Sequence, residues 1–189
     1  MSQKLCYARN RAELDLPARF DDASVRKNVE TDLAVIDTLD EQVRALELYL
    51  TRSAKVDDPQ AYQRLRSVPG VGPVLALVLL YEIHDIRRFE EVGQFLSYAR
   101  LVRCSHESAG KVKGSGGRRI GNAHLRWAFG EAACLLLRES EAAKKWLARK
   151  ERKVGKGRAL GALAAKLGRA VYHLLRKQEA FDMSRFFAS

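Results

Sequence analysis

The sequence has few of the features that mark a secreted, disulfide-bonded or membrane protein. Its three cysteines, Cys6, Cys104 and Cys134, are scattered over 189 residues without metal-ligand spacing. Such cysteines are typical of a reduced intracellular protein. The longest apolar run, residues 74–81, is far too short to span a bilayer, and the N-terminus lacks the apolar core of a signal peptide. The sequence therefore predicts a cytoplasmic protein with no membrane partner, no metal site and no cofactor of its own.

Alternating β-branched residues, the pattern of a half-buried strand, are also absent. Apolar residues recur instead at helical spacing, which predicts an all-α fold. Residues 1–59 are interpreted as a lead-in and a long coiled-coil-like linker helix, with residues 1–20 poorly ordered because they show no clear period. Residues 60–189 are predicted to form a separate helical domain.

The linker helix is predicted from a seven-residue repeat. Two seams run along it, one of Val29, Ile36, Val43 and Leu50, the other of Val25, Asp32, Leu39 and Leu46. Asp22 or Ser24 can cap a helix that continues to about Arg52. An apolar stripe of about four heptads is typical of a coiled coil, so we expect a homo-oligomer that associates through the Val25–Leu50 helix. The alternative is a long helix that folds back on its own domain.

Acidic residues are scarce in the C-terminal half. The net charge is +11, yet residues 1–60 carry nine Lys or Arg against twelve Asp or Glu. Residues 100–189 carry 21 basic and 7 acidic residues, so the whole basic excess lies there. A localised positive charge of this size indicates a nucleic-acid partner.

Residues 62–84 are interpreted as two helices joined by a glycine-containing turn. Pro69 ends the first helix and Pro73 can begin the second. Between them, Gly70, Val71 and Gly72 are candidate DNA-binding residues, because backbone N–H groups at such a turn can hydrogen-bond a phosphate. The pattern resembles the helix-hairpin-helix motif, which binds DNA backbones without sequence preference. The alternative is an ordinary helical corner that binds no ligand.

Residues 100–121 form a basic, glycine-rich loop ahead of a helix predicted to begin near Asn122. A basic run is often only a solvated face, but basic residues among glycines before a helix favour a polyanion cradle. The candidate DNA-binding side chains in and just after this loop are Arg103, Lys111, Lys113, Arg118, Arg119 and Arg126.

The order of the motifs PGVGPVLA, RF, Ser-Ala-Gly and GNAHLR resembles one group of bacterial transposases. These are the insertion-sequence transposases related to the pilin-gene invertase, and the resemblance to their C-terminal half covers nearly the whole chain. It implies a DNA-binding domain for transposition or site-specific recombination, with Ser108 as the catalytic nucleophile. It also implies a bridging noncoding RNA as a partner, and a DEDD nuclease domain, N-terminal to this region, that binds divalent metal.

The sequence shows no carboxylate cluster that could replace a DEDD domain, so the chain is expected to be a truncated or split form without enzymatic activity of its own. Spacing alone does not separate Ser108 from Ser105 and Ser115, or from an inert loop serine, and His106 is only a candidate base. Two other interpretations stay open. One is a non-catalytic helix-hairpin-helix protein that binds DNA or RNA, and the other is a structural RNA-binding protein of ribosomal type.

Overall fold

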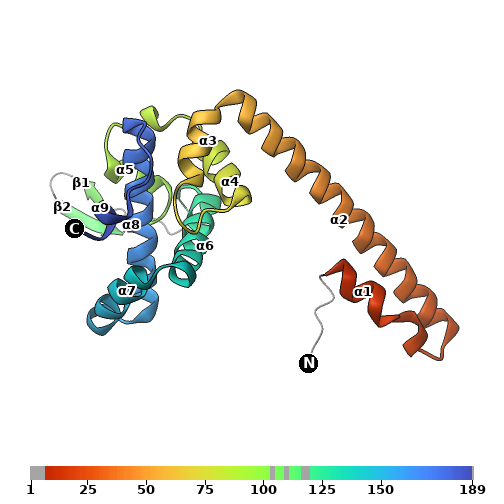
Figure 1. Cartoon of the computed structure of the whole chain (residues 1–189). Coiled ribbons are helices and arrows are strands. Elements are labelled where there is room, and N and C mark those ends of the chain that lie inside the picture. Colours follow the sequence, from red (N-terminus) through yellow and green to blue (C-terminus); the bar gives the residue numbers. More distant parts are fainter. Residues whose placement is uncertain (1–6, 103–104, 109–110, 116–119, 189) are drawn as a thin grey trace. The chain divides into compact units, whose positions relative to one another are not determined.

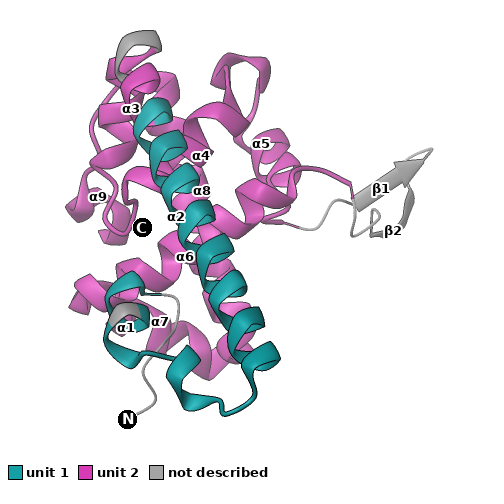
Figure 2. Ribbon diagram, turned by 90° about the vertical axis from the view of Figure 1, so that its right-hand side faces the viewer, with its two compact units in different colours: residues 1–50 teal, residues 51–189 magenta. Residues whose placement is uncertain are grey.

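A computed structural model of the chain describes residues 7–102, 105–108, 111–115 and 120–188. The chain divides into two compact units, residues 1–50 and residues 51–189, which Figure 2 shows in different colours. The sequence-based division after residue 59 follows the end of the long helix, whose last turns belong to the second unit. No helix among the described residues combines the length and the apolar character needed to cross a membrane.

The first unit contains α1 (Ala8–Leu14), a 3-10 turn η1 (Pro17–Arg19) and most of α2 (Ala23–Asp57). The prediction of a poorly ordered lead-in is therefore wrong from residue 8 onward. Arg11 of α1 is buried and forms ion pairs with Asp37 at 2.7 Å and Asp40 at 2.5 Å, both on α2. Hydrogen bonds to Asp40 and then Asp37 raise the pKa of Arg11 above its usual value. A helix of seven residues is too short for its period to be recognised, and this tertiary ion pair stabilises it.

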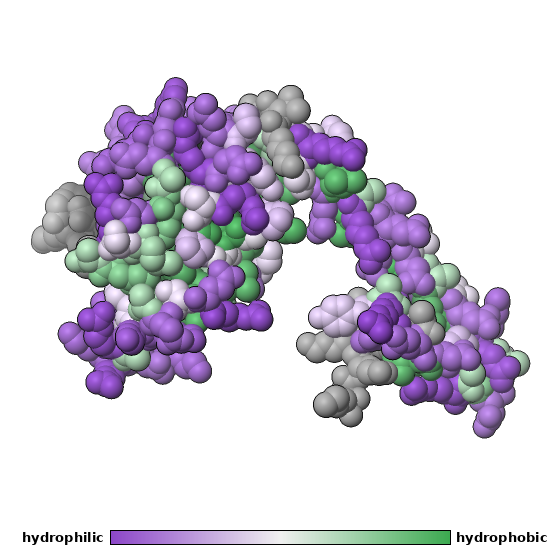
Figure 3. All heavy atoms as spheres, in the orientation of Figure 1, coloured by the Kyte–Doolittle hydropathy of each residue, from purple (hydrophilic) through white to green (hydrophobic). Residues whose placement is uncertain are grey.

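Helix α2 is continuous over 35 residues, as the heptad pattern predicts. Asp22 accepts hydrogen bonds from the N–H groups of Ser24 and Val25 at 2.7 and 3.1 Å, which confirms it as the capping residue. Several seam residues are exposed: Val25, Ile36, Leu39, Val43, Leu46 and Leu50. Figure 3 shows hydrophobic side chains among hydrophilic ones along this helix. Within the first unit, much of the apolar stripe is therefore uncovered.

The second unit is built mainly of helices (Figure 1). They are α3 (Pro59–Arg66), α4 (Pro73–Ile83), the 3-10 turn η2 (Ile86–Arg88), α5 (Val92–Tyr98), α6 (Ala123–Glu139), α7 (Glu141–Val154), α8 (Lys156–Lys177) and α9 (Met183–Ala188). Side chains that precede four of these α-helices accept hydrogen bonds from their first turns: Asp58 for α3, Asn122 for α6, Ser140 for α7 and Asp182 for α9. These caps satisfy backbone donors that a helix start otherwise leaves unpaired.

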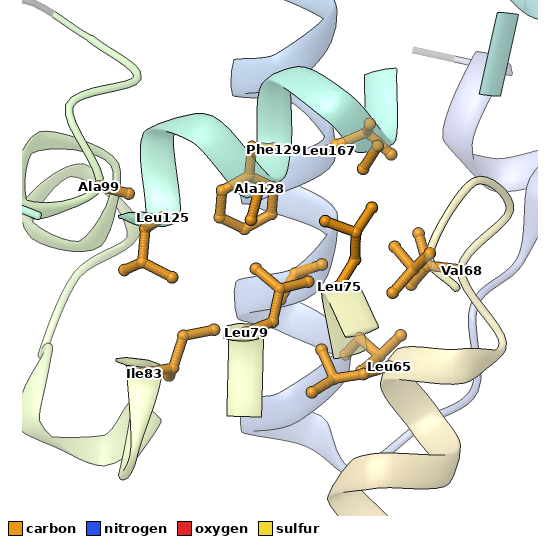
Figure 4. Packing of buried hydrophobic residues seen from close by; sticks show 14 of the residues in the cluster. Leu65, Val68, Leu75, Leu79, Ile83, Ala99, Leu125, Ala128, Phe129 and Leu167 are labelled. Atoms are coloured by element: carbon orange, nitrogen blue, oxygen red, sulfur yellow. The ribbon is translucent and has the colours of Figure 1, made fainter. Parts of the chain in front are cut away.

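One hydrophobic core holds this unit together, with α6 packed between α4 and α8. Figure 4 shows Leu75 and Leu79 of α4 meeting Phe129 of α6, with Leu65 at the side where α3 closes the core. The Tyr172 hydroxyl of α8 donates to the carbonyl oxygens of Phe89 and Glu90 at 3.1 and 3.0 Å. This buried tyrosine ties α8 to the segment that leads into α5.

The loop at residues 100–121 differs from the prediction of a strand-free chain. It contains two short antiparallel strands, β1 (Ser105–Ser108) and β2 (Lys111–Ser115). The fold is otherwise helical, as predicted. Strands of four and five residues are too short for a period-2 pattern to be recognised, and their glycine and lysine content disfavours strand by propensity. The hairpin therefore could not be predicted from the local pattern.

Candidate nucleic-acid interface

The turn between α3 and α4 contains one glycine with a left-handed backbone, Gly70, and this glycine packs against another helix of the same chain. Gly70 has a φ of +83°, and a Cβ there would lie 2.5 Å from the carbonyl oxygen of Ala132 and 2.7 Å from the nitrogen of Leu136, both in α6. The close approach at Gly70 is therefore to α6 of the same chain. The N–H of Val71 donates to the carbonyl oxygen of Val68 at 3.0 Å, so it is already used within the turn.

Gly72 differs from Gly70 because no other part of the chain packs where its side chain would be. It is the N-cap of α4, and a Cβ there would meet nothing within 4 Å. The Arg66 guanidinium donates to the carbonyl oxygen of Val71 at 2.9 Å and lines a cavity of about 320 Å³ beside the turn. Glu139 of α6 lines the same cavity. The cavity beside the turn is thus bordered by the Arg66 guanidinium, the start of α4 and the Glu139 carboxylate.

The two ends of the basic loop are joined at its base. Arg100 adopts a φ of +55° directly after α5, and its Nε donates to the carbonyl oxygen of Ile120 at 3.1 Å. The N–H of Asn122 donates to the carbonyl oxygen of Tyr98 at 2.6 Å. Gly121 lies so close that a Cβ would be 2.5 Å from the same oxygen. The loop therefore leaves and re-enters the helical unit at one point.

Asn122 also links the loop base to α4 and α5. Its Oδ1 accepts from the N–H of Leu125, while its Nδ2 donates to Glu82 at 2.6 Å and lies 3.4 Å from the Tyr98 hydroxyl. The hydrogen bond from Asn122, followed by one from Arg88, lowers the pKa of Tyr98. The Arg88 guanidinium also lies 4.6 Å from the ring centroid of Tyr98. The network holds the start of α6 in a fixed orientation beneath the loop.

Sequence reasoning missed this supporting network. Glu82, Arg88 and Tyr98 come from separate helical segments. Only Arg88 lies in one of the quoted motifs, RF, and that motif does not indicate its contact with Tyr98. The local signal was Asn122, near which the sequence predicts a helix start, and the structure confirms it as the N-cap of α6. Its second role, through the amide nitrogen, depends on which residues the fold brings near it.

The register of the hairpin separates the three candidate serines. Ser108 is the last residue of β1 and pairs with Lys111, the first residue of β2, next to the connection between the strands. Ser105 pairs with Ser115 at the opposite end, and the register shifts between Ser105 and Glu107. Ser108 therefore belongs to the tip of the hairpin, and its two rivals belong to the base.

The structure brings the predicted site residues together only in part. Gly70, Val71 and Gly72 share one turn, and Arg126 is exposed in the first turn of α6, close to the loop base in sequence. Lys111 and Lys113 lie on β2, where the structure describes the backbone path. Arg103, Arg118 and Arg119 lie outside the described residues. Where the structure is described, no group of three or more His, Cys, Asp or Glu residues could hold a metal ion.

Comparison with known proteins places this region in context. Residues 62–147, from α3 into α7, match the family described as transposase IS116/IS110/IS902. The transposase for insertion sequence element IS1111A of Coxiella burnetii is 33% identical over 146 residues, which cover 75% of this chain and 40% of that protein. A putative transposase of Sinorhizobium fredii is 32% identical over 146 residues, covering 74% of this chain and 37% of its own length.

The chain thus spans about two fifths of the length of these two curated relatives. The region matched by the family contains the turn between α3 and α4, here called the glycine turn, and the base of the loop at residues 100–121. It also contains the hairpin of β1 and β2, here called the serine hairpin. Through this region, the chain is related to the insertion-sequence transposases of the IS116/IS110/IS902 family.

Proposed function

We propose that this chain is a DNA-binding domain of an insertion-sequence transposase and acts in DNA transposition, a form of site-specific recombination. The observation that carries the proposal is the match of residues 62–147 to transposases. The positive charge supports it, because residues 100–189 carry 21 basic and 7 acidic residues on the unit that holds the hairpin. Transposases act on DNA, and such a charge attracts its phosphates.

The proposed DNA surface combines the glycine turn with the basic loop. At the turn, the N–H of Gly72, the start of α4 and Arg66 can reach a phosphate, so the two helices act as a helix-hairpin-helix motif. Gly70 and Val71 contribute by shaping this turn. The loop adds Arg103, Lys111, Lys113, Arg118 and Arg119, and α6 adds Arg126. These contacts position DNA without reading its sequence.

The chemistry proposed for Ser108 is attack on a phosphodiester. Its Oγ forms a bond to phosphorus, the bond from phosphorus to the leaving sugar oxygen breaks, and that oxygen takes up a proton. The Oγ proton passes to a base or to water. The place of Ser108 at the hairpin tip, beside Lys111, favours it over Ser105 and Ser115 because a tip can reach the DNA backbone most easily. The loop cations would stabilise the charge that develops on the phosphate.

Activity is proposed to need parts that these residues do not supply. Divalent metal would be bound by the carboxylates of a DEDD nuclease domain, elsewhere in the protein or on a separate chain. A noncoding RNA is the proposed partner that selects the DNA site, since phosphate contacts carry no sequence information. Without these parts, we expect the chain to bind DNA and to cut none.

DNA binding should be electrostatic and tolerant of sequence. Six to eight phosphate contacts give a slope of about −5 to −7 in a plot of log affinity against log salt, at roughly −0.9 per contact. Replacing Arg118 and Arg119 with alanine should weaken binding to unrelated duplexes equally and flatten the slope by about two. Fluorescence anisotropy titrations between 50 and 200 mM salt measure both quantities. A slope near zero, or a loss confined to one sequence, contradicts the proposal.

The chain is also proposed to form a homo-oligomer through the Val25–Leu50 part of α2. Leu46 lies in the apolar seam and is 60% exposed, while Leu48 lies outside it and is 52% exposed. Leu46→Asp should raise the dissociation constant of the oligomer at least about 100-fold, because burying an unpaired charge costs several kcal/mol. Leu48→Asp is the matched control and should leave association unchanged. Analytical ultracentrifugation at micromolar concentrations measures both, and a wild-type chain that stays monomeric at tens of micromolar refutes the association.

A further inference from the structure

Helix α8 carries a row of basic side chains that the glycine turn and the serine loop do not use. Lys166, Arg169, His173 and Lys177 follow one another at intervals of three or four residues, so they share one face of the helix. At 1.5 Å rise per residue, a four-residue step is about 6 Å along the axis. This step is comparable to the separation of successive phosphates in an extended single strand of nucleic acid.

The row borders a cavity closed on its other side by the C-terminal segment. All four residues line a cavity of about 300 Å³, together with Phe181 and Phe186. Helix α9 lies close to α8 in the fold (Figure 1). The remaining apolar lining comes from Ala170, Leu174 and Ala180. The cavity therefore has a basic wall on α8 and an apolar wall beside it.

The two carboxylates at this cavity are already engaged. Asp182 accepts hydrogen bonds from the N–H groups of Ser184 and Arg185, at 2.9 and 3.2 Å. Glu179 forms an ion pair with Arg185 at 3.6 Å. By contrast, Arg169, His173 and Lys177 form no ion pair with any residue that the structure describes. Arg169 and Lys177 are therefore the cations of this row that can bind an anionic ligand.

The local electrostatics agree with this distribution of charge. Burial and then the neighbouring Arg169 lower the pKa of Lys166. Burial, then Lys177 and Arg169, lower the pKa of His173. His173 thus has the cations Arg169 and Lys177 as neighbours on the same helix, and a bound anion would offset the repulsion among them.

A second cavity lies next to the first along α8. It measures about 570 Å³ and shares Lys166 and Arg169 with the first, so the two lie side by side along α8. Leu101 and Val102, which follow α5 in the chain, form part of its lining. Leu101 is seated on α8 at Gly168, where a Cβ would lie 2.4 Å from its Cδ1. We call the two cavities together the α8 groove.

We propose that the α8 groove binds one single strand of nucleic acid, with its phosphates on Arg169 and Lys177 and a base against the half-buried ring of Phe181. Phe186 is buried behind it, with the Lys166 ammonium 5.3 Å from its ring centroid. Basic grooves with aromatic side chains are the usual means of binding a single strand, because every base has an apolar face. The stacked, paired bases of a duplex cannot enter a cavity of about 300 Å³. This proposal deepens the proposed function, on which it rests for its nucleic-acid partner. It does not depend on chemistry at Ser108.

The test compares two charge-matched double variants. Arg169→Ala with Lys177→Ala removes two cations of the groove, while Arg149→Ala with Lys150→Ala removes two exposed cations of α7 that line neither cavity. Fluorescence anisotropy is measured with a 12-nucleotide deoxythymidine strand, the matching uridine strand and a 12-base-pair duplex. Thermal melting of each variant shows that the fold is kept, which we expect since the replaced side chains are exposed.

The groove variant should bind one or both single strands about tenfold more weakly and flatten their salt slope by about 1.4, at roughly −0.7 per contact. Its binding to the duplex should change no more than that of the α7 variant. Equal losses in both double variants, or an equal loss for duplex and single strand, overturn the proposal. Displacement of the strand by polyglutamate at equal charge concentration would also overturn it, since the groove would then bind any polyanion.

The same titrations separate this proposal from the proposed function. The double variant Arg118→Ala with Arg119→Ala tests whether the basic loop at residues 100–121, here called the loop cradle, binds the duplex. If it binds duplex normally while the groove variant loses the single strand, the loop cradle is wrong and the groove stands. If the loop variant loses the duplex and the groove variant retains the single strand, the reverse holds.

Discussion

Replacing Ser108 with alanine is expected to abolish the covalent adduct between protein and DNA while changing DNA affinity less than about twofold. The hydroxyl is the proposed nucleophile, so without it no bond to phosphorus can form. One hydroxyl contributes little to a contact set dominated by Lys and Arg. The measurement uses this chain supplied with a matching DEDD domain, divalent metal and the guide RNA. Adducts are detected on a denaturing gel, and affinity is measured in parallel.

The hairpin supplies its own controls for this experiment. Ser105→Ala and Ser115→Ala alter the paired positions at the base of the hairpin and should keep the adduct. An adduct that persists in Ser108→Ala shows that another residue is the nucleophile. DNA cleavage by the unmodified chain alone would refute the requirement for a DEDD domain. If no adduct forms under any condition and DNA binding is normal, the alternative of a non-catalytic helix-hairpin-helix protein is favoured.

Gly70→Ala is expected to destabilise the second unit by about 2 to 4 kcal/mol, the combined effect of a strained backbone and an overpacked contact. The φ of +83° is unfavourable for alanine, and the added Cβ would lie 2.5 Å from the Ala132 carbonyl oxygen. That oxygen belongs to the backbone of α6 and cannot move without moving the helix. Chemical denaturation followed by circular dichroism measures the loss as a lower midpoint.

Gly72→Ala is the matched control in the same turn. Its φ is −73°, and a Cβ there would meet nothing within 4 Å. Stability should change by less than about 0.5 kcal/mol, as for most open surface sites. If DNA approaches this turn closely, the same variant should weaken DNA binding while it remains folded. Equal stability losses in the two variants would mean that the turn does not pack on α6 as described.

The sequence by itself determined the features that depend on neighbouring residues. Asp22 and Asn122 were recognisable as helix caps, and Pro73 as a helix start, because capping acts over three or four residues. The continuity of α2 followed from its heptads. The link to transposases also followed from motif order along the chain, and residues 62–147 agree with it. None of these inferences needs to know which distant segments meet.

Only the tertiary structure decided how residues far apart in sequence are used. The sequence predicts that the backbone at Gly70 can approach a phosphate. In the structure, α6 occupies the space beside Gly70, although it lies more than 60 residues later in the chain. Arg11 orders a segment predicted to be irregular because Asp37 and Asp40 lie opposite it. Asn122 reaches Glu82, and Lys166 meets the C-terminal segment across the α8 groove. Such contacts arise from packing, whose partners are set by the whole core, so no local pattern in the sequence records them.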